Sequence, residues 1–259
     1  MASPDKGGPD SPAAVVLAAG SGTRLRPLTA VLPKALCPVA NVALVDRAVA
    51  RARAVTAAVA VNVHHGRARM EAHLEGAGVH VAVEDTVALG TAGALGNLRP
   101  WIAGRPVLVV NADAWHRADL AAFTASWDGE RPRLLTVTDR RLATWGDRAY
   151  AGAALLPWTQ VRRFSPTPSG LWEVSWRYLR PGVDLELVHH DGPFLDCGTP
   201  GSYLAANLAE SGGCPVIGEG AVVDGDLDRS VVWPGARVVA GERLRCAVRA
   251  ADRVTVLVR

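Results

Sequence analysis

Short apolar segments alternate with segments of helical spacing through the first 140 residues of this chain. The alternation predicts a Rossmann-like α/β fold, a doubly wound and mostly parallel sheet with helices on both faces. Strands are expected at 13–20, 57–63, 79–85, 105–113 and 133–139, and helices at 41–55, 66–76, 91–102 (broken near Gly96) and 118–127. Ligands of such sheets bind at the carboxyl ends of the strands, so Gly20, Glu84 or Asp85, and Asp113 are the first candidate site residues.

The second half of the chain has a less regular pattern. Five aromatic residues lie close together, and we expect them to fill a core rather than to line a pocket: Trp158, Phe164, Trp172, Trp176 and Tyr178. A helix is expected over 198–211, with Thr199 as its N-cap and Pro200 in its first turn.

Beyond Gly213 the pattern of apolar residues and glycines changes again. Val232, Val238 and Leu244 recur every six residues, and glycines accompany them. A six-residue apolar period with glycine at the corners indicates a few turns of a β-helix, with a plain β-hairpin extension as the alternative.

Composition excludes several classes of protein. The formal net charge of +3 is too small, and too evenly spread, to favour nucleic acid or a membrane surface as a partner. No apolar run is long enough for a membrane span, and residues 1–12 read as a polar, disordered tail without an apolar signal core. The four cysteines match no zinc pattern, so we expect reduced thiols and a cytoplasmic protein.

Lysine is almost absent, which draws attention to one position. Of the 28 Lys and Arg residues only Lys6 and Lys34 are lysines, and Lys34 closes the segment "GSGTRLRPLTAVLPK" at 20–34. This segment is neither a Walker A loop nor a dinucleotide fingerprint. Its small residues can direct backbone N–H groups at phosphate oxygens, and Arg24 and Lys34 add mobile and fixed positive charge.

The complete string G-x-G-T-R-x-x-P-L-T-x-x-x-P-K-x-L resembles the signature of the sugar-phosphate nucleotidyltransferases, or NDP-sugar pyrophosphorylases. Three further stretches resemble family segments in the same order: "LGTAGAL" (89–95), "VVNAD" (109–113) and "FLDCGTPGSYLAAN" (194–207). The resemblance covers about residues 13 to 210. The repeats beyond it resemble the left-handed β-helix of some members, notably mannose-1-phosphate guanylyltransferases.

The resemblance implies a catalytic domain at 13–213 and a hexapeptide-repeat extension at 214–259, through which the chain could form a homo-oligomer. It implies a nucleoside triphosphate and a sugar 1-phosphate as substrates, with Mg²⁺ as cofactor. Arg24, Lys34 and Asp113 would be catalytic, and Asp113 and Asp196 would hold the metal. The implied nucleotide-binding residues are Leu17, Ala18, Ala19, Gly20, Ser21, Gly22, Thr23, Arg24, Gly90 and Thr91, and the implied substrate-binding residues are Asn111, Asp113 and Asp196. Two candidates come from the residues themselves: Glu84 for the nucleotide, since it or Asp85 could read the donor edge of guanine, and Glu173 for the substrate, as a contact to sugar hydroxyls.

Departures from the family pattern leave the substrates open. Ala112 replaces the usual glycine of "NGD", and no lysine follows Lys34, although many members hold the sugar phosphate with a Glu-Lys pair. GDP-mannose synthesis is the first expectation because of the repeats. The alternatives are a uridylyl- or thymidylyltransferase acting on another sugar 1-phosphate, and a regulatory subunit that binds nucleotide without turnover.

Overall fold

The computed structural model describes residues 11–252 and 254–258, so most of the expected disordered tail, residues 1–10, lies outside the described residues. The described chain forms two compact units. The first contains residues 11–20 and 48–194, and the second contains residues 21–47 and 195–258. The signature segment after Gly20 therefore belongs to the same unit as the C-terminal repeats. No helix in the described ranges is long and apolar enough to cross a membrane.

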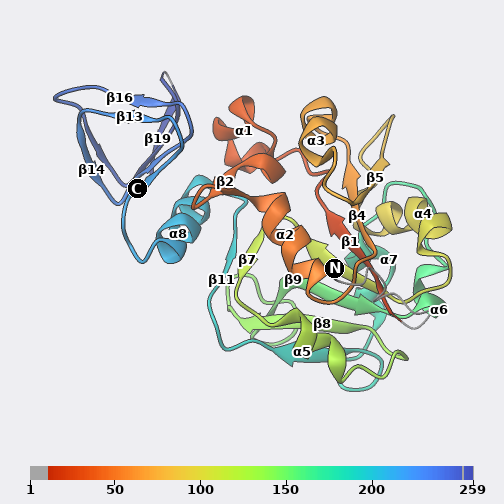
Figure 1. The fold of residues 1–259 in the computed structure, drawn as a ribbon. Coiled ribbons are helices and arrows are strands. Elements are labelled where there is room, and N and C mark those ends of the chain that lie inside the picture. The colour runs from red at the N-terminus through yellow and green to blue at the C-terminus, as the bar shows by residue number, and fades with distance from the viewer. Residues whose placement is uncertain (1–10, 253, 259) are drawn as a thin grey trace, which may run out of the picture. The chain divides into compact units, whose positions relative to one another are not determined.

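A seven-stranded sheet organises the first unit, in the order β10-β8-β9-β6-β1-β4-β5 (Figure 1). Its strands are β1 (Ala13–Leu17), β4 (Val59–Val63), β5 (His80–Val83), β6 (Val107–Asn111), β8 (Arg133–Thr138), β9 (Arg148–Leu156) and β10 (Glu186–His189), and the short β7 (Ala114–His116) follows β6. All neighbouring pairs are parallel except the two that β9 makes with β6 and β8. The prediction of a mostly parallel α/β sheet is confirmed.

The register of the sheet brings the predicted strand ends together. Leu17, the last residue of β1, pairs with Asn62 in β4 on one side and with Asn111 in β6 on the other. Val63 in turn pairs with Val83 at the end of β5. The carboxyl ends of β1, β4, β5 and β6 therefore share one edge of the sheet, as expected for a ligand site in this class of fold.

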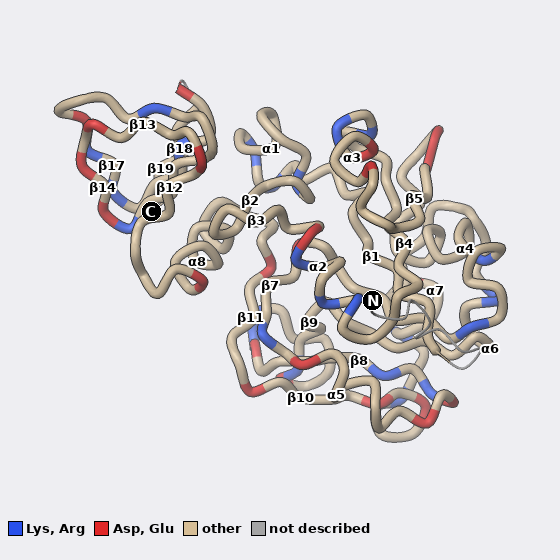
Figure 2. Tube along the Cα trace, viewed as in Figure 1, with Lys and Arg blue, Asp and Glu red and all other residues tan. Residues whose placement is uncertain are grey.

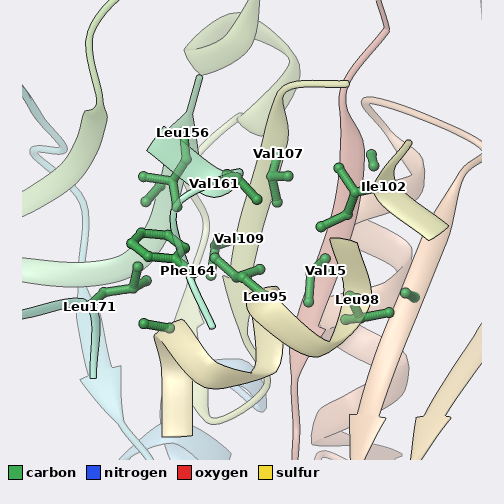
Figure 3. Packing of buried hydrophobic residues seen from close by; sticks show 14 of the residues in the cluster. Val15, Leu95, Leu98, Ile102, Val107, Val109, Leu156, Val161, Phe164 and Leu171 are labelled. Atoms are coloured by element: carbon green, nitrogen blue, oxygen red, sulfur yellow. The ribbon is translucent and has the colours of Figure 1, made fainter. Parts of the chain in front are cut away.

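Helices cover both faces of the central strands. They are α2 (Leu44–Arg53, which begins in the second unit), α3 (Arg67–Leu74), α4 (Gly90–Ile102), α5 (Leu120–Ala125), α6 (Trp158–Val161) and α7 (Leu171–Val174), with a 3-10 turn η3 at Trp176–Tyr178. Leu95, Leu98 and Ile102 of α4 pack on Val15 and Val109 (Figure 3). Ala14 and Val16 point to the opposite face and are equally buried, so that face is covered too.

The expected break near Gly96 is wrong, because α4 runs without interruption from Gly90 to Ile102. Gly90, Gly93 and Gly96 recur every third residue and form a bare stripe along the helix. A Cβ at Gly96 would overlap the backbone of Ser165, and one at Gly93 would overlap that of Thr167. The glycines thus let the chain over 165–169 lie directly on the helix, and they serve packing rather than a break.

Residues 145–194 contain regular structure that the sequence pattern did not indicate. The nine-residue β9 completes the sheet between β6 and β8. Phe164 and Trp176 join the core, as expected of the aromatic cluster, whereas Trp172 and Tyr178 are exposed. The cluster is therefore divided between core and surface.

The second unit assembles around α8 (Pro200–Glu210), which confirms the helix predicted over 198–211. Thr199 caps it, since its Oγ1 accepts from Ser202 N–H at 3.3 Å. The segment 21–47 contributes η1 (Thr23–Leu25), α1 (Leu28–Val31), η2 (Lys34–Leu36), β2 (Pro38–Val39) and β3 (Val42–Ala43), and β11 (Phe194–Asp196) precedes α8.

Tyr203 of α8 connects the two parts of this unit. Its side chain is fully buried, and its hydroxyl donates to the Pro38 carbonyl while accepting from Trp233 Nε1 at 3.0 Å. One turn along the helix, Asn207 Oδ1 accepts from Ala40 N–H at 2.9 Å. The same helix therefore holds the chain that follows Lys34 and the C-terminal repeats.

The C-terminal residues form coils of short parallel strands, as the six-residue period predicts. The strands are β12 (Val216–Ile217), β13 (Val222–Val223), β14 (Asp226–Asp228), β15 (Val231–Val232), β16 (Arg237–Val238), β17 (Arg243–Arg245), β18 (Ala247–Ala251) and β19 (Val254–Leu257). Val232, Val238 and Leu244 fill their interior. β12, β13 and β14 pair in parallel with β15, β16 and β17, and only β19 runs antiparallel.

Opposite charges line one side of these coils. Acidic residues of β14 face arginines of β17 (Figure 2), with Asp226 and Asp228 paired to Arg243 and Arg245 at 3.2 and 3.1 Å. These four side chains are well exposed, and pairs of this kind contribute little to stability. The buried apolar column is the main source of cohesion between the coils.

Replacement of Gly96 by alanine tests the packing of α4. The added methyl group would meet the backbone of Ser165, so we expect Gly96→Ala to lower the free energy of unfolding by about 1–3 kcal/mol despite its better helix propensity. Urea denaturation measures the change. Asn97→Ala, at the exposed neighbouring position, is the control and should be neutral or slightly stabilising. An equally stable Gly96→Ala protein would contradict the close approach.

Candidate active site

The signature segment turns back on itself at Gly22. This residue has a φ of 63°, and a Cβ there would lie 2.8 Å from Thr29 Cγ2 and 2.9 Å from Lys34 Cβ. Thr29 Oγ1 donates to the Gly22 carbonyl at 3.0 Å. Both the backbone conformation and the crowding call for glycine, and the result is that Lys34 lies against the turn that it follows by twelve positions.

Arg24 and Lys34 meet the carboxylate of Asp196. Arg24 Nη2 donates to Asp196 Oδ2 at 3.3 Å, and Lys34 Nζ lies 3.8 Å from Oδ1. The side chain of Lys34 is 12% exposed, against 67% for Arg24. A mostly buried ammonium and an exposed guanidinium thus share one carboxylate, which leaves a net positive charge suited to a phosphate chain.

Gly198 leaves the room that this cluster needs. A Cβ at Gly198 would lie 2.8 Å from both Arg24 Nη2 and Asp196 Oδ1. The sequence motifs predict all three charged residues, and the structure brings them together within the second unit. Their direct pairing has no sequence signal, because Arg24 and Asp196 are 172 positions apart.

Cys37 lies three positions after Lys34, and its thiol is not set up to act as a nucleophile. Burial raises the pKa of its thiol to about 12, and the charge of Lys34 offsets this only in part. Its Sγ donates weakly to the carbonyls of Pro33 and Leu32 at 3.6 and 3.9 Å. At neutral pH the thiol is protonated, so covalent catalysis by Cys37 is not available.

In the first unit, Asp113 follows the end of β6. The Ala112 N–H donates to the Leu17 carbonyl at 3.1 Å, which extends the pairing of β1 with β6 by one residue before the chain turns. Burial, together with the charge of Asp113, raises the pKa of the Tyr150 hydroxyl well above its usual range. Gly152 brings β9 close to this turn, since a Cβ there would overlap the side chain of Ala114. Sequence reasoning identified Asp113 but missed Tyr150 and Gly152, which lie in the unpredicted β9.

Glu84 is buried rather than facing solvent. Its side chain accepts from Asn62 Nδ2 and from Leu89 N–H, each at 2.7 Å. The neighbouring Asp85 is exposed and pairs with Arg67. Asn62 was not among the expected residues, although it is the one polar residue in the strand "VAVNV". Burial and two short bonds mark Glu84 and Asn62 as parts of one network.

Gly90 and Thr91 begin α4 where the chain over 169–171 crosses it. Thr91 Oγ1 accepts from Leu171 N–H at 2.7 Å, and a Cβ at Gly90, whose φ is 70°, would crowd the Ser169 carbonyl. Glu173 follows on α7 and is exposed. The start of α4 therefore contacts the segment 169–171, which leads directly into α7 and Glu173.

His64 and His65 each contact a backbone carbonyl at the ligand edge of the sheet. His64 Nδ1 lies 2.6 Å from the Glu84 carbonyl oxygen, and His65 Nδ1 lies 2.9 Å from that of Ala19. One nitrogen of each ring, Nδ1, is thus occupied by main chain.

The carboxylates have the donor chemistry that Mg²⁺ requires. Magnesium is bound through one or two carboxylates, with the remaining ligands from water and substrate phosphates. Within 11–252 and 254–258 no group of three or more His, Cys, Asp or Glu side chains could hold a metal by itself. Asp113 is half-buried at a strand end, and the Asp196 carboxylate is 35% exposed, so each fits a site that substrate phosphates complete.

Comparisons with known proteins point to one family. Residues 13–141 match the nucleotidyl transferase family model. An N-acetylmuramate alpha-1-phosphate uridylyltransferase of Caulobacter vibrioides is 40% identical over 130 residues, which is 46% of this chain and 54% of the relative. The mannose-1-phosphate guanylyltransferase catalytic subunit beta of Dictyostelium discoideum is 26% identical over 224 residues, which is 74% of this chain and 62% of the relative.

A solved structure matches nearly the whole chain. It is described as a mannose-1-phosphate geranyltransferase from Thermus thermophilus, and it superposes with a TM-score of 0.68 at 16% identity, over 95% of both chains. At this identity the likeness shows the fold alone. The matched segments span about half to two thirds of the curated relatives.

Thiol labelling tests whether Cys37, three positions after Lys34, is buried. At pH 8 we expect iodoacetamide to modify the exposed Cys214 quickly and the buried Cys37 only after unfolding, because the Cys37 thiol stays protonated far above that pH. Peptide mapping by mass spectrometry follows both sites over time, and the same reaction in urea is the control. Equal labelling rates in the native protein would show that Cys37 is not buried as described.

Proposed function

Because residues 13–141 place this chain among the nucleotidyl transferases, we propose that it condenses a nucleoside triphosphate with a sugar 1-phosphate, giving an NDP-sugar and pyrophosphate. The observation that carries the proposal is the convergence of Arg24 and Lys34 on Asp196. Two cations with one carboxylate between them suit a reaction that brings two polyanions together.

The chemistry needs charge stabilisation more than proton transfer. The attacking phosphate oxygen of a sugar 1-phosphate is largely ionised at pH 7, since its second pKa is about 6. No general base is required. Arg24, with the amides of Gly20 to Thr23, would hold the leaving phosphates, and Lys34 would contact the reacting phosphates, where a compact ammonium fits better than a guanidinium. Asp113 in the first unit and Asp196 in the second are each proposed as a carboxylate ligand for Mg²⁺, which when bound neutralises phosphate charge.

The nucleobase and the sugar are the finer part of the proposal. GDP-mannose synthesis is supported by the likeness to the Dictyostelium guanylyltransferase over 74% of this chain, and by the C-terminal coils, for which we propose a left-handed winding. A uridylyltransferase acting on another sugar 1-phosphate is favoured by the higher identity, 40%, to the Caulobacter enzyme. We propose that the coils also offer a surface for a homo-oligomer, that the protein acts in the cytoplasm, and that it takes no nucleic acid as substrate.

A panel assay tests the function and the metal together. Pyrophosphate release is measured with GTP, UTP, dTTP, ATP and CTP, each against mannose, glucose and N-acetylmuramate 1-phosphates. We expect one pair to give turnover with Mg²⁺ and none with excess chelator. Asp113→Asn should lose at least a hundredfold in kcat, because it weakens a metal ligand. Asp191→Asn, an almost fully exposed carboxylate in the same unit, is the control. Absence of turnover with every pair would overturn the proposed reaction, and full activity of Asp113→Asn would overturn the metal assignment.

Substitution of Lys34 separates charge from shape. Lys34→Ala should reduce kcat by about 10²–10³, by analogy with removal of one preorganised transition-state donor. Lys34→Arg should recover only part of this loss, because the side chain is 12% exposed and a planar guanidinium cannot take the place of the compact ammonium beside Asp196. Steady-state kinetics gives both values, with Arg243→Ala, an exposed cation of the same unit, as the control. Wild-type kcat in Lys34→Arg would mean that any cation suffices.

A further inference from the structure

A line of hydrogen bonds connects four segments at the ligand edge of the sheet. Ala18 N–H donates to Asn62 Oδ1 at 2.7 Å, Asn62 Nδ2 donates to Glu84 Oε1 at 2.7 Å, and Leu89 N–H donates to Glu84 Oε2 at 2.7 Å. The Asn62 and Glu84 side chains are each 3% exposed. The carboxyl ends of β1, β4 and β5 and the start of α4 are therefore joined by one buried polar line.

Both ends of this line are backbone amides of segments assigned to the nucleotide. Ala18 lies directly before Ala19 and Gly20, and Leu89 directly precedes Gly90 and Thr91. The two histidines hold neighbouring backbone, since His65 bonds to the Ala19 carbonyl and His64 to the Glu84 carbonyl. The side chains of Asn62 and Glu84 thus hold the main chain at Ala18 and at Leu89, along the same edge of the sheet.

The line works only with one carboxylate and one amide in its middle. The two ends, Ala18 N–H and Leu89 N–H, are both donors. The side chains at 62 and 84 must therefore each offer an acceptor to one of these amides, and one of the two side chains must also donate to the other. A carboxylate accepts at both oxygens, and an amide accepts at one atom and donates at the other. Asn with Glu meets this count, and Asp with Gln in the same order meets it equally. Asn with Gln leaves two donors facing each other, and Asp with Glu leaves two acceptors.

We propose that Asn62 and Glu84 are positioning residues that fix the backbone of 18–20 and 89–91 for the nucleotide, and that Glu84 does not read the base. The inference rests on the proposed function. Both Glu84 oxygens already accept a bond from the protein, so a base placed against Glu84 would have to compete with the Asn62 amide and the Leu89 N–H. Base recognition then belongs to other groups of the edge.

The test exchanges the amide of Asn62 and the carboxylate of Glu84. Asn62→Asp and Glu84→Gln are made singly and together, and nucleotide affinity is measured by calorimetry with the triphosphate that the wild-type enzyme uses. Each single change breaks one bond of the line, and we expect Kd to rise about tenfold or more. The double variant restores all three bonds with the roles reversed, and its Kd should return to within about threefold of wild type. Glu71→Gln, a carboxylate-to-amide change on the exposed face of α3, is the matched control.

Kinetics separates positioning from a general loss of folded protein. In the single variants the KM for the triphosphate should rise, while kcat and the KM for the sugar 1-phosphate stay within about twofold. A merely structural defect would lower kcat at unchanged KM, and that result would overturn the proposal. So would a double variant no better than the singles, or a Glu84→Gln protein with altered preference among the triphosphates, which would mean that Glu84 reads the base. Wild-type turnover is measured in the same series, so failure of the proposed reaction remains distinguishable from failure of the exchange.

Discussion

The conformation of the signature segment depends on contacts with residues far away in the chain. Between 21 and 47 the helices have three to ten residues and the strands two, and such short elements are not stable in isolation. The missing contacts come from Asp196, four positions before α8, and from α8 itself. They join Asp196 to Arg24, Tyr203 to Pro38, Asn207 to Ala40 and Glu210 to Arg47, across separations of 163 to 172 positions. Closing a loop of that length costs entropy, which burial around Tyr203 and Trp233 offsets.

Much of the fold and part of the candidate site could be predicted from the sequence. Buried strands such as "AAVVL" and "VLVVN" are continuous apolar runs, and the motifs identify Arg24, Lys34 and Asp196 by residue type and spacing. β9 was missed because "RAYAGAALL" is rich in Ala and Gly and alternates weakly. Gly96 was misread because a glycine that serves packing looks, in one dimension, like a helix breaker. Asn62 stood out only as the polar residue of an apolar strand, and its pairing with Glu84 had no signal, because the two lie 22 positions apart and only the sheet brings them together.

The ligand edge of the first unit is built mainly from backbone. The ends of β1 and the start of α4 carry Ala, Gly and Thr, and the larger polar side chains nearby, Asn62, His64 and His65, bond to main chain or to Glu84. Backbone groups recognise shape and phosphate well but distinguish related ligands less sharply than side chains do. The curated relatives that this chain matches carry names for different nucleotides, a uridylyltransferase and a guanylyltransferase.

The pairing of Asp196 with Arg24 and Lys34 has a consequence for small anions. A tethered carboxylate competes for the two cations at an effective concentration that is of millimolar order or higher. A chloride ion or a single phosphate interacts with Arg24 and Lys34 little more strongly than the Asp196 carboxylate does, and its binding costs translational entropy. A chain of linked phosphates engages both cations at once and loses that freedom only once. We therefore expect Asp196 to favour anions that carry several linked phosphates over chloride or a single phosphate at this cluster.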